Sequence, residues 1–331
     1  MKLLFVAVLL ISFLSFVSPG FATPHPGHND GLRHRYYHKT CPQAEEIIRK
    51  MMDEFIKIDS DIAPHLVRMH FHDCFIRGCD GSILLNSTST SKAEKDASIN
   101  KPSLGGFGKI EKMKAALEAA CPNTVSCADL LAYATREAVH KAGNFPRYKV
   151  RGGRKDGRVS CANETESNLP RSSVDLKAIA RFFRAKNLRL KDAVTLLGAH
   201  SFGDAHCSVI GGRYEKNFNH TGKPDPTLNP ALAAKLRKAC AVSSDPTVSQ
   251  DSITPDVLDN KYYVGLLQHK GLFTADAALL TSKKTRRLVR LYAAKPATWK
   301  KKFAKAMIKL GEVQVKYGEE GEIRKRCDVV N

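Results

Sequence analysis

The sequence predicts a mainly α-helical protein, because helical periodicity dominates the chain and strand signals are scarce and short. Apolar residues recur three and four positions apart in residues 41–58, 107–121, 126–143, 173–187, 191–201 and 298–311. Beyond the first segment, about 300 residues remain, enough for one large domain or two packed lobes around a sizeable core. No repeat, low-complexity tract or obvious linker follows Cys41.

The ends and faces of these helices follow from single residues. A Cys-Pro pair opens the segment 41–58, and Gly143 is expected to stop the helix over 126–143. In the segment 298–311, lysines lie opposite one apolar stripe, formed by Trp299, Phe303, Met307 and Leu310. We interpret this segment as a core helix with a solvated face, in preference to a membrane-binding or nucleic-acid-binding helix.

The first 22 residues have a basic start, an apolar run and small residues at Gly20 and Ala22, which is the pattern of a secretory signal peptide. The apolar run is short for a bilayer span, so a membrane anchor is the less favoured interpretation, and no later segment is apolar enough to span. Residues 23–31 are rich in Pro, Gly and His and are predicted to be a flexible lead-in.

Composition and short motifs add three expectations for an exported chain. All nine cysteines follow the signal segment and indicate a disulfide framework with at least one thiol left over. The net charge is +20, and removal of Lys2 with the signal segment gives +19. This charge favours acidic wall polysaccharide over nucleic acid as a partner, with plain solubility as an equal alternative. Asn-x-Ser/Thr sequons at Asn86, Asn163 and Asn219 predict exposed loops.

Residues 67–74, VRMHFHDC, concentrate polar side chains in an apolar run, which is costly unless they are used. On a helix, Arg68 and His72 share one face, whereas His70 lies about 200° around the axis from each. A guanidinium lowers the pKa of a neighbouring imidazole, and it can stabilise developing negative charge. We therefore interpret Arg68 and His72 as an electrostatic stabiliser and a general base; a structural Arg–His pair is the alternative. Zinc bound by His70 and His72 would need a strand.

Two further segments are rich in oxygen ligands. The loop 73–82 could bind calcium, although its spacing is not that of an EF-hand; its hard oxygens come from Asp73, Asp80 and Ser82. A second set of oxygens lies in residues 250–263. His200 ends the apolar helical segment 191–201, and taken alone it is more typical of a core histidine with satisfied hydrogen bonds than of a ligand.

Seven motifs together resemble those of the secretory plant haem peroxidases, the class III family. In chain order they read VRMHFHDCFIRGCDGSILL, AEKDASIN, SCADLLA, LLGAHSFGDAHC, TPDVLDNKYY, GLFTADAALL and GEIRKRC. The resemblance extends from Leu32 to Asn331 and implies a haem peroxidase domain over residues 32–331. The fold that it implies is mainly α and two-lobed, with haem between a distal and a proximal lobe.

The resemblance also implies roles on the distal side of the haem. His72 resembles the histidine that moves a proton from one peroxide oxygen to the other, and Arg68 the arginine that stabilises charge as the O–O bond breaks. Asn100 resembles the asparagine that bonds to this histidine, and Glu94 the acid tied to that asparagine. Phe71 resembles the residue that shapes the pocket.

On the proximal side, His200 resembles the axial ligand of the iron of one haem b, and Asp276 the buried acceptor of its N–H. Ser103 falls among the cofactor-binding residues, and Pro170 beside the haem edge where aromatic donors dock. Two calcium ions are implied. The distal set is Asp73, Ile76, Gly78, Asp80 and Ser82, and the proximal set is Ser201, Asp251, Thr254, Val257 and Asp259.

The family's disulfide pattern leaves Cys161 over. It would pair Cys41 with Cys121, Cys74 with Cys79, Cys127 with Cys327, and Cys207 with Cys240. Gln250 departs from the family, because an apolar residue usually packs there near the haem. Tyr148 and Gly105 are among the other departures, standing where the family usually has tryptophan and arginine.

The function implied is reduction of hydrogen peroxide with one-electron oxidation of small phenolic donors, in cell-wall metabolism, lignification, or stress and defence. The chain is expected to be a monomer secreted to the apoplast or cell wall, with no nucleic-acid or membrane partner. Two alternatives stay open. One is a basic wall-binding protein with little catalysis, and the other is a non-haem metalloenzyme using His70 and His72.

Overall fold

The computed structural model describes residues 31–215 and 218–331. The expected signal peptide, residues 1–22, lies outside the described residues, as does all but the last residue of the 23–31 lead-in. Within the described ranges, no helix combines the length and apolar character needed to cross a membrane.

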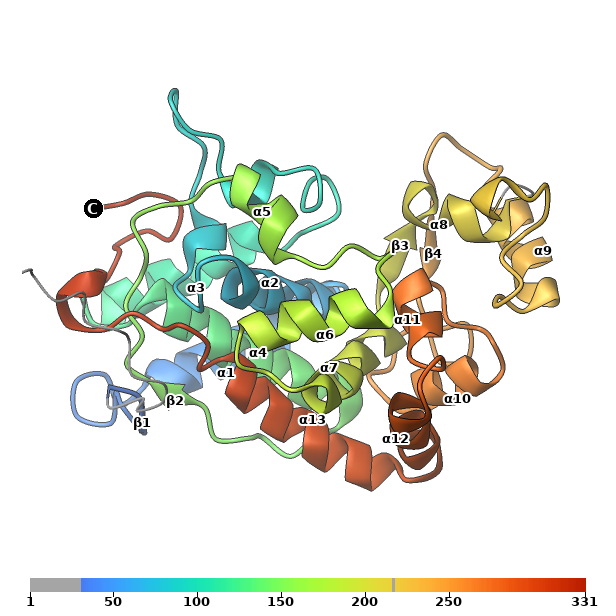
Figure 1. Ribbon diagram of the computed structural model, residues 1–331. Helices are drawn as coiled ribbons and strands as arrows, with labels where there is room; N and C mark the ends of the chain where they lie inside the picture. Colours follow the sequence, from blue (N-terminus) through green and yellow to red (C-terminus); the bar gives the residue numbers. More distant parts are fainter. Residues whose placement is uncertain (1–30, 216–217) are drawn as a thin grey trace, which may run out of the picture. The chain divides into compact units, whose positions relative to one another are not determined.

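The described chain is mainly α-helical, as the sequence predicts, and its strands have two or three residues each (Figure 1). The α-helices are α1 Ala44–Ile58, α2 Ile62–Ile76, α3 Phe107–Ala120, α4 Cys127–Gly143, α5 Asn163–Asn168, α6 Leu176–Ala185, α7 Leu190–Leu196, α8 Cys207–Tyr214, α9 Pro230–Ala239, α10 Lys261–Leu267, α11 Thr274–Ala278, α12 Lys283–Ala294 and α13 Pro296–Leu310. The 3₁₀ helices are η1 Ser82–Leu84, η2 Glu94–Asp96, η3 Leu197–Ser201, η4 Phe218–His220 and η5 Gly318–Glu320. The strands are β1 Arg33–His34, β2 Arg151–Gly152, β3 Asp204–His206 and β4 Thr247–Ser249.

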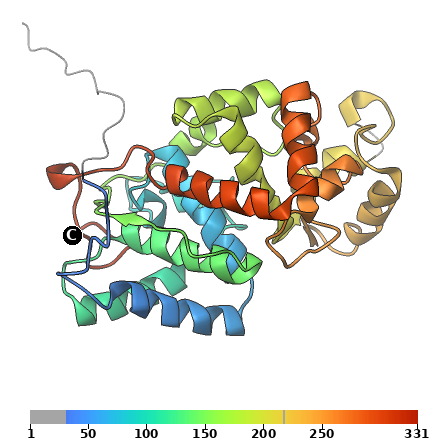
Figure 2. The same cartoon turned by 90° about the horizontal axis from the view of Figure 1, so that it is seen from below.

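Helix α4 is the centre of the first half of the described chain. It is buried along most of its length and packs against α1, α2 and α3 (Figure 2). Its start is fixed by Ser126, whose hydroxyl accepts a hydrogen bond from the backbone N–H of Asp129. This packing holds α2, the helix that carries Arg68 and His72, between buried elements.

In the second half, α13 packs on α7, and α12 packs on α7 and α10. The apolar stripe of α13 is buried as predicted, and Trp299 stacks edge-on against Tyr263 of α10 at 5.8 Å between ring centroids. The segment carrying His200 belongs to this half, because η3 contacts both α7 and α10.

The turn after His200 brings the two halves together. Gly203 has φ +84°, and a Cβ there would lie 2.8 Å from Cβ of Pro64 in α2. Only glycine allows this backbone conformation and this close approach without strain. Directly afterwards β3 pairs antiparallel with β4, with Asp204 opposite Ser249. Near the start of the described chain, β1 pairs in the same way with β2.

The four disulfides join the pairs that the family resemblance implies. They are Cys41–Cys121, Cys74–Cys79, Cys127–Cys327 and Cys207–Cys240, and Cys161 is free. The bond at Cys327 closes a loop of 200 residues and fastens the C-terminal segment to the start of α4. A native disulfide typically stabilises a fold by about 2–4 kcal/mol.

Two helix ends differ from the prediction. The segment 191–201 is not one α-helix: α7 ends at Leu196, and His200 lies on the tighter η3. In η3, Gly198 is in close contact with Tyr263 and Trp299, since a Cβ there would lie 2.6–2.7 Å from their polar atoms. Gly143 is the last residue of α4 and packs against Leu258, while Asn144, with φ 49°, provides the left-handed cap.

Candidate active site

His72 and Arg68 lie on the same face of α2, one turn apart, as the helical period predicts. The buried His72 contacts Asn100, with 2.5 Å between Nδ1 and Oδ1. Asn100 in turn donates from Nδ2 to the backbone carbonyl of Glu94 at 2.7 Å, which fixes the orientation of its amide. Because the amide oxygen can only accept, Nδ1 of His72 carries the proton, and Nε2 keeps its lone pair.

The charges on this face are set by burial. Desolvation, reinforced by the positive charge of Arg68, lowers the pKa of His72 to about 3. Burial lowers the pKa of Arg68 to about 10. At neutral pH the pair is therefore a neutral imidazole that can accept a proton beside a guanidinium that stays charged.

The guanidinium of Arg68 is held by two contacts. Nη1 donates to Oγ of Ser103 at 2.9 Å, and Nη2 donates to the backbone carbonyl of Ile99 at 2.8 Å. Phe71 is half-buried beside this face, where its ring stacks on Phe75 at 4.2 Å between centroids. The two hydrogen bonds orient Arg68 without neutralising it.

His200, on η3, is a second histidine with a defined orientation. Its Nδ1 donates to Oδ1 of Asp276 at 2.8 Å, and the same oxygen accepts a bond from the hydroxyl of Tyr262 at 2.7 Å. Burial alone raises the pKa of Asp276, but the charge and hydrogen bond of His200 hold it below its usual value. Asp276 therefore stays a carboxylate, and Nε2 of His200 is free of protein partners among the described residues.

Comparison with known proteins places this chain in a family. The peroxidase family model matches residues 45–295. Peroxidase 5 of Vitis vinifera is 46% identical over 89% of this chain and 90% of its own length. Peroxidase 2 of Zea mays is 43% identical over 89% and 88%, and peroxidase 24 of Arabidopsis thaliana is 41% identical over 91% and 87%. The chain belongs to the plant class III peroxidase family.

Peroxidases of this class depend on haem, and the residues of this peroxidase suit that group. Haem iron needs one protein nitrogen, and Nε2 of His200 is available because the bond to Asp276 fixes the ring tautomer. Among the described residues, no three His, Cys, Asp or Glu side chains are grouped so that they could hold a metal ion by themselves.

Tyr262 is a member of this site that sequence reasoning missed. Tyr262 lies in the TPDVLDNKYY motif, but nothing in that motif indicates that its hydroxyl reaches Asp276, fourteen positions further along the chain. Burial raises the pKa of Tyr262, so its hydroxyl remains a donor. Tyr262 and His200 therefore compete for the negative charge on one oxygen of Asp276.

Replacing Tyr262 with phenylalanine is expected to lower the reduction potential of the haem-loaded peroxidase. Without the competing hydroxyl, Asp276 withdraws more of the Nδ1 proton and makes His200 a stronger electron donor. Turnover should fall by no more than about 10–100-fold, the loss that is typical of removing a residue that supports a metal ligand, since the histidine and carboxylate remain. Spectroelectrochemistry measures the potential. Tyr263→Phe is the matched control, because that hydroxyl donates to the carbonyls of Val194 and Thr195; equal shifts in both variants would count against the role of Tyr262.

Calcium is typical of this class, and the acidic cluster around loop 73–82 suits it. Burial, and after it repulsion by neighbouring carboxylates, raises the pKa values of Asp73 and Glu94 well above normal; Asp80 acts on both residues. Oε1 of Glu94 is buried without a hydrogen bond, and Oδ2 of Asp80 has only a 3.4 Å ion pair with Lys316. Ser82 donates to the other oxygen of Glu94 at 3.2 Å. Crowded carboxylates of this kind call for a cation that accepts hydroxyl and carbonyl oxygens as well.

Glu94 thus differs in one detail from its expected place. Its backbone carbonyl, not its carboxylate, binds Asn100. The carboxylate turns toward Ser82, so one residue connects the hydrogen-bond support of His72 to the loop 73–82. In that loop, the carbonyl of Ile76 accepts from Nζ of Lys186 at 3.0 Å, and the carbonyl of Gly78, a residue with φ +98°, accepts from the backbone N–H of Asp80.

The second oxygen-rich set also comes together. The hydroxyl of Thr254 lies 3.1–3.2 Å from carboxylate oxygens of both Asp251 and Asp259. Oγ of Ser201 accepts from the backbone N–H of Asp259 at 3.2 Å, and Val257 is exposed next to this cluster. Burial raises the pKa of Asp251. Two carboxylates this close would repel each other when both are charged, and a bound cation would relieve that repulsion. Ser201 follows His200 directly, so this cluster adjoins His200.

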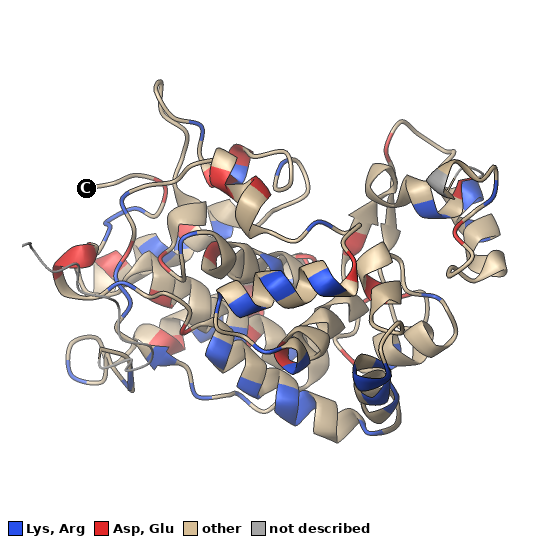
Figure 3. Cartoon of the chain, in the orientation of Figure 1, with Lys and Arg blue, Asp and Glu red and all other residues tan. Residues whose placement is uncertain are grey.

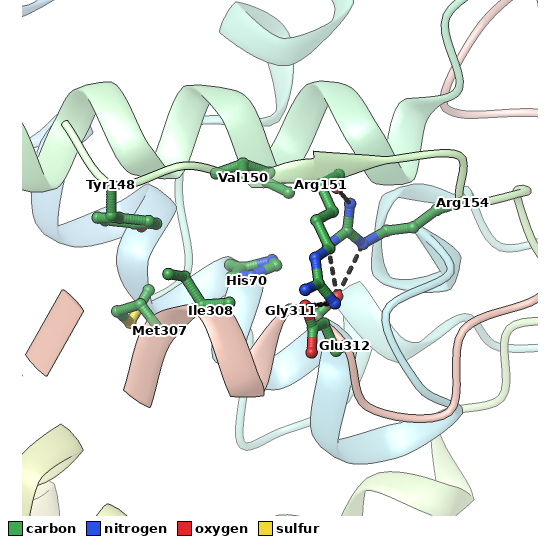
Figure 4. A pocket seen from close by; sticks show the side chains of 10 residues that line it. His70, Tyr148, Val150, Arg151, Arg154, Met307, Ile308, Gly311 and Glu312 are labelled. Carbon is green, nitrogen blue, oxygen red and sulfur yellow. Dashed lines mark hydrogen bonds and ion pairs between the residues drawn. The ribbon is translucent and has the colours of Figure 1, made fainter. Parts of the chain in front are cut away.

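His70 faces away from His72, as the helical period predicts. It is fully buried and lines a cavity of about 10 Å³ with Tyr148, Arg154 and Gly311 (Figure 4). Burial, with a smaller contribution from Arg154, lowers its pKa to about 3. This cavity has room for about one water molecule, so His70 has a structural environment.

Gln250 replaces an apolar family residue and is only partly satisfied. Its Nε2 donates to the carbonyl of Asp204 at 3.0 Å, whereas its buried Oε1 has no hydrogen bond.

Pro170 is half-buried between α5 and α6. Asn86 is exposed in a loop, as its sequon predicts, whereas Asn163 is exposed but begins α5; the side chain of Asn219 lies outside the description.

Proposed function

We propose that this peroxidase is a secreted enzyme that reduces hydrogen peroxide and oxidises small phenolic donors in one-electron steps. The observation that carries the proposal is the pair formed by a neutral His72 and a charged Arg68 on one face of α2. A general base whose tautomer is fixed, next to a fixed cation, matches a reaction that moves a proton while negative charge develops.

Each residue then has a stated task. Nε2 of His72 accepts a proton from one oxygen of hydrogen peroxide. It then returns this proton to the other oxygen, which departs as water. Arg68 stabilises the charge on the leaving oxygen, while Asn100 keeps the proton on Nδ1 of His72. One bound haem b would supply the redox chemistry, with His200 as the protein ligand and Asp276 holding the Nδ1 proton of that ligand.

The remaining parts of the proposal concern the whole chain. Residues 1–22 are proposed to be a signal peptide and 23–31 a flexible lead-in, with the peroxidase domain over 32–331 acting as a monomer in the apoplast or cell wall. The four disulfides support export, since they form in oxidising compartments. Donors are proposed to dock near Pro170, in cell-wall metabolism, lignification, or stress and defence.

The test is to express the chain with haem and to follow its absorbance spectrum and its oxidation of guaiacol on adding peroxide. A haem spectrum that responds to peroxide, with turnover of the donor, supports the proposal. A protein that binds haem but oxidises neither guaiacol nor a panel of other phenols would contradict it. That result would favour the alternative of a wall-binding protein with little catalysis.

Removing calcium is expected to destabilise this peroxidase. A ligand at 100 times its dissociation constant stabilises the folded state by about 2.7 kcal/mol per site, and thorough chelation removes that contribution. Thermal unfolding with and without calcium measures the difference. Asp80→Asn should shrink the calcium response, whereas Asp225→Asn, a buried aspartate paired with Arg213, should keep it. If the unfolding temperature of the wild-type protein is the same with and without calcium, both proposed sites are ruled out.

A further inference from the structure

The surface formed by α12 and α13 carries many cations and no acid. Between Asp276 and Glu312 the sequence has eleven Lys and Arg and no Asp or Glu. Arg286, Lys300 and Lys309 bind protein groups, which are the carbonyls of Leu280 and Gly143 and the carboxylate of Asp192. The other eight are exposed and have no protein partner among the described residues. We call them the basic face: Lys283, Lys284, Arg287, Arg290, Lys295, Lys301, Lys302 and Lys305.

The folding of the two helices explains why these charges point outward. Helix α12 buries Thr285, Val289 and Tyr292, and α13 buries Trp299 and Phe303. The cations occupy the remaining sides of each helix. Helices α12 and α13 pack on each other, and Lys and Arg positions are frequent along both (Figure 3), so we treat their charged sides as one basic surface.

A second basic stripe lies on α6. Lys177, Arg181 and Arg184 are spaced at i, i+4 and i+7, and they line an open hollow of about 830 Å³ along that helix. The acid in this hollow, Asp175, already caps α6 by accepting from the N–H of Ala178. Helix α7 packs on α6, α12 and α13, and its exposed Lys191 adds one more charge between the stripe and the basic face.

The cations of the basic face repel one another, and no acidic side chain described on α12 or α13 offsets this repulsion. Like charges four residues apart on a helix, such as Lys283 with Arg287 and Lys301 with Lys305, destabilise it by about 0.2–0.5 kcal/mol per pair. Some exposed cations elsewhere on the chain, such as Arg49 and Arg326, are paired with acids. An anionic ligand outside the molecule would neutralise the basic face.

We propose that the basic face binds a linear acidic polysaccharide, a polymer with a carboxylate on successive sugar units. The disulfides indicate an oxidising compartment, where nucleic acid is not the expected partner. Single-stranded nucleic acid also needs exposed aromatic rings for base stacking, and Tyr292 and Trp299 are buried. A membrane surface needs an apolar fringe, whereas Leu291 is the one large exposed apolar side chain described on these two helices.

A linear polymer also fits the weakness of each contact. An exposed ion pair contributes about 0.2–1 kcal/mol, so binding depends on many pairs forming at once along an extended chain. The contacts are solvent-exposed and therefore screened by salt. This inference concerns attachment and is independent of the proposed catalytic roles of His72 and Arg68.

The experiment measures binding of the full, haem-loaded protein to polygalacturonate by co-sedimentation or interferometry, at low and high salt. Methyl-esterified polygalacturonate, which keeps the sugar chain but loses the carboxylates, is the ligand control. The test variant carries Lys284→Glu, Lys301→Glu, Lys302→Glu and Lys305→Glu. The matched control variant carries Lys39→Glu, Lys57→Glu, Lys112→Glu and Lys149→Glu, which are exposed on other elements and change the net charge equally.

We expect the wild-type protein to bind polygalacturonate at low salt and to release it at high salt. It should not bind the methyl-esterified form. The test variant should bind at least about tenfold more weakly, and the control variant much less so. Oxidation of guaiacol should be the same in all three proteins, so a failure to bind leaves the proposed catalysis untouched. Equal losses in both variants would overturn the proposal, because net charge alone would then explain binding. Binding of phosphatidylserine vesicles but not of polygalacturonate would overturn it in favour of a membrane.

Discussion

Replacing His72 with leucine is expected to slow the reaction of this haem-loaded peroxidase with hydrogen peroxide by about 10²–10⁴-fold. Leucine keeps the apolar volume of the side chain but removes Nε2, the lone pair that accepts the peroxide proton. The hydrogen bond from Asn100 to the carbonyl of Glu94 would remain, so the neighbourhood should stay folded. Stopped-flow absorbance of the haem band measures the rate.

His70 provides the control for this prediction. It lies two residues away on the opposite side of α2 and faces the small cavity beside Arg154 and Gly311. His70→Gln is expected to lower the unfolding temperature while leaving the peroxide reaction within about tenfold of wild type, since it holds no reacting proton. If the His72 variant reacts as fast as wild type, or if only the His70 variant is slow, the assignment of the two faces is wrong.

Replacing Arg68 with leucine is expected to slow the same reaction by about 10²–10³-fold, the typical cost of losing one electrostatic stabiliser of a transition state. Arg68→Lys should fall between wild type and Arg68→Leu. Lysine keeps the charge but loses the planar fork that reaches Ser103 and the carbonyl of Ile99 together. An Arg68→Leu enzyme with the wild-type rate would contradict the role.

For Arg68→Leu we also expect a shift of the pH–rate profile in a defined direction. Burial and, after it, the charge of Arg68 hold the pKa of His72 near 3. Removing that charge raises the pKa, so His72 becomes protonated, and useless as a base, at higher pH than in wild type. The acid limb of the pH–rate profile should therefore move to higher pH in Arg68→Leu. A limb that stays in place would show that burial alone sets the pKa of His72.

The sequence alone predicted the local parts of this site. Helical periodicity over 67–74 separates Arg68 and His72 from His70, because a regular helix converts spacing into direction. Clusters of carboxylates and hydroxyls within ten or so residues of each other indicated where calcium could bind, because those ligands are close in the chain. The net charge indicated a polyanionic partner without saying which surface would meet it.

Motif resemblance supplied what periodicity could not. Nothing in the spacing of His200 and Asp276, 76 positions apart, predicts a hydrogen bond between them. Likewise, the family's disulfide pattern gave the four pairings, which cysteine counting alone leaves open. The resemblance did not reveal the shared oxygen of Asp276 or the turn of the Glu94 carboxylate toward Ser82.

What the sequence determined by itself was composition, helical faces and the presence of each reactive side chain. Tertiary structure alone decided which distant groups share an atom, where the His200 segment tightens into a 3₁₀ helix, and how the cations of α12 and α13 combine into one surface. The physical reason is range. Backbone geometry fixes neighbours within a few turns, whereas contacts between separate helices depend on how buried side chains such as Trp299 and Tyr263 pack.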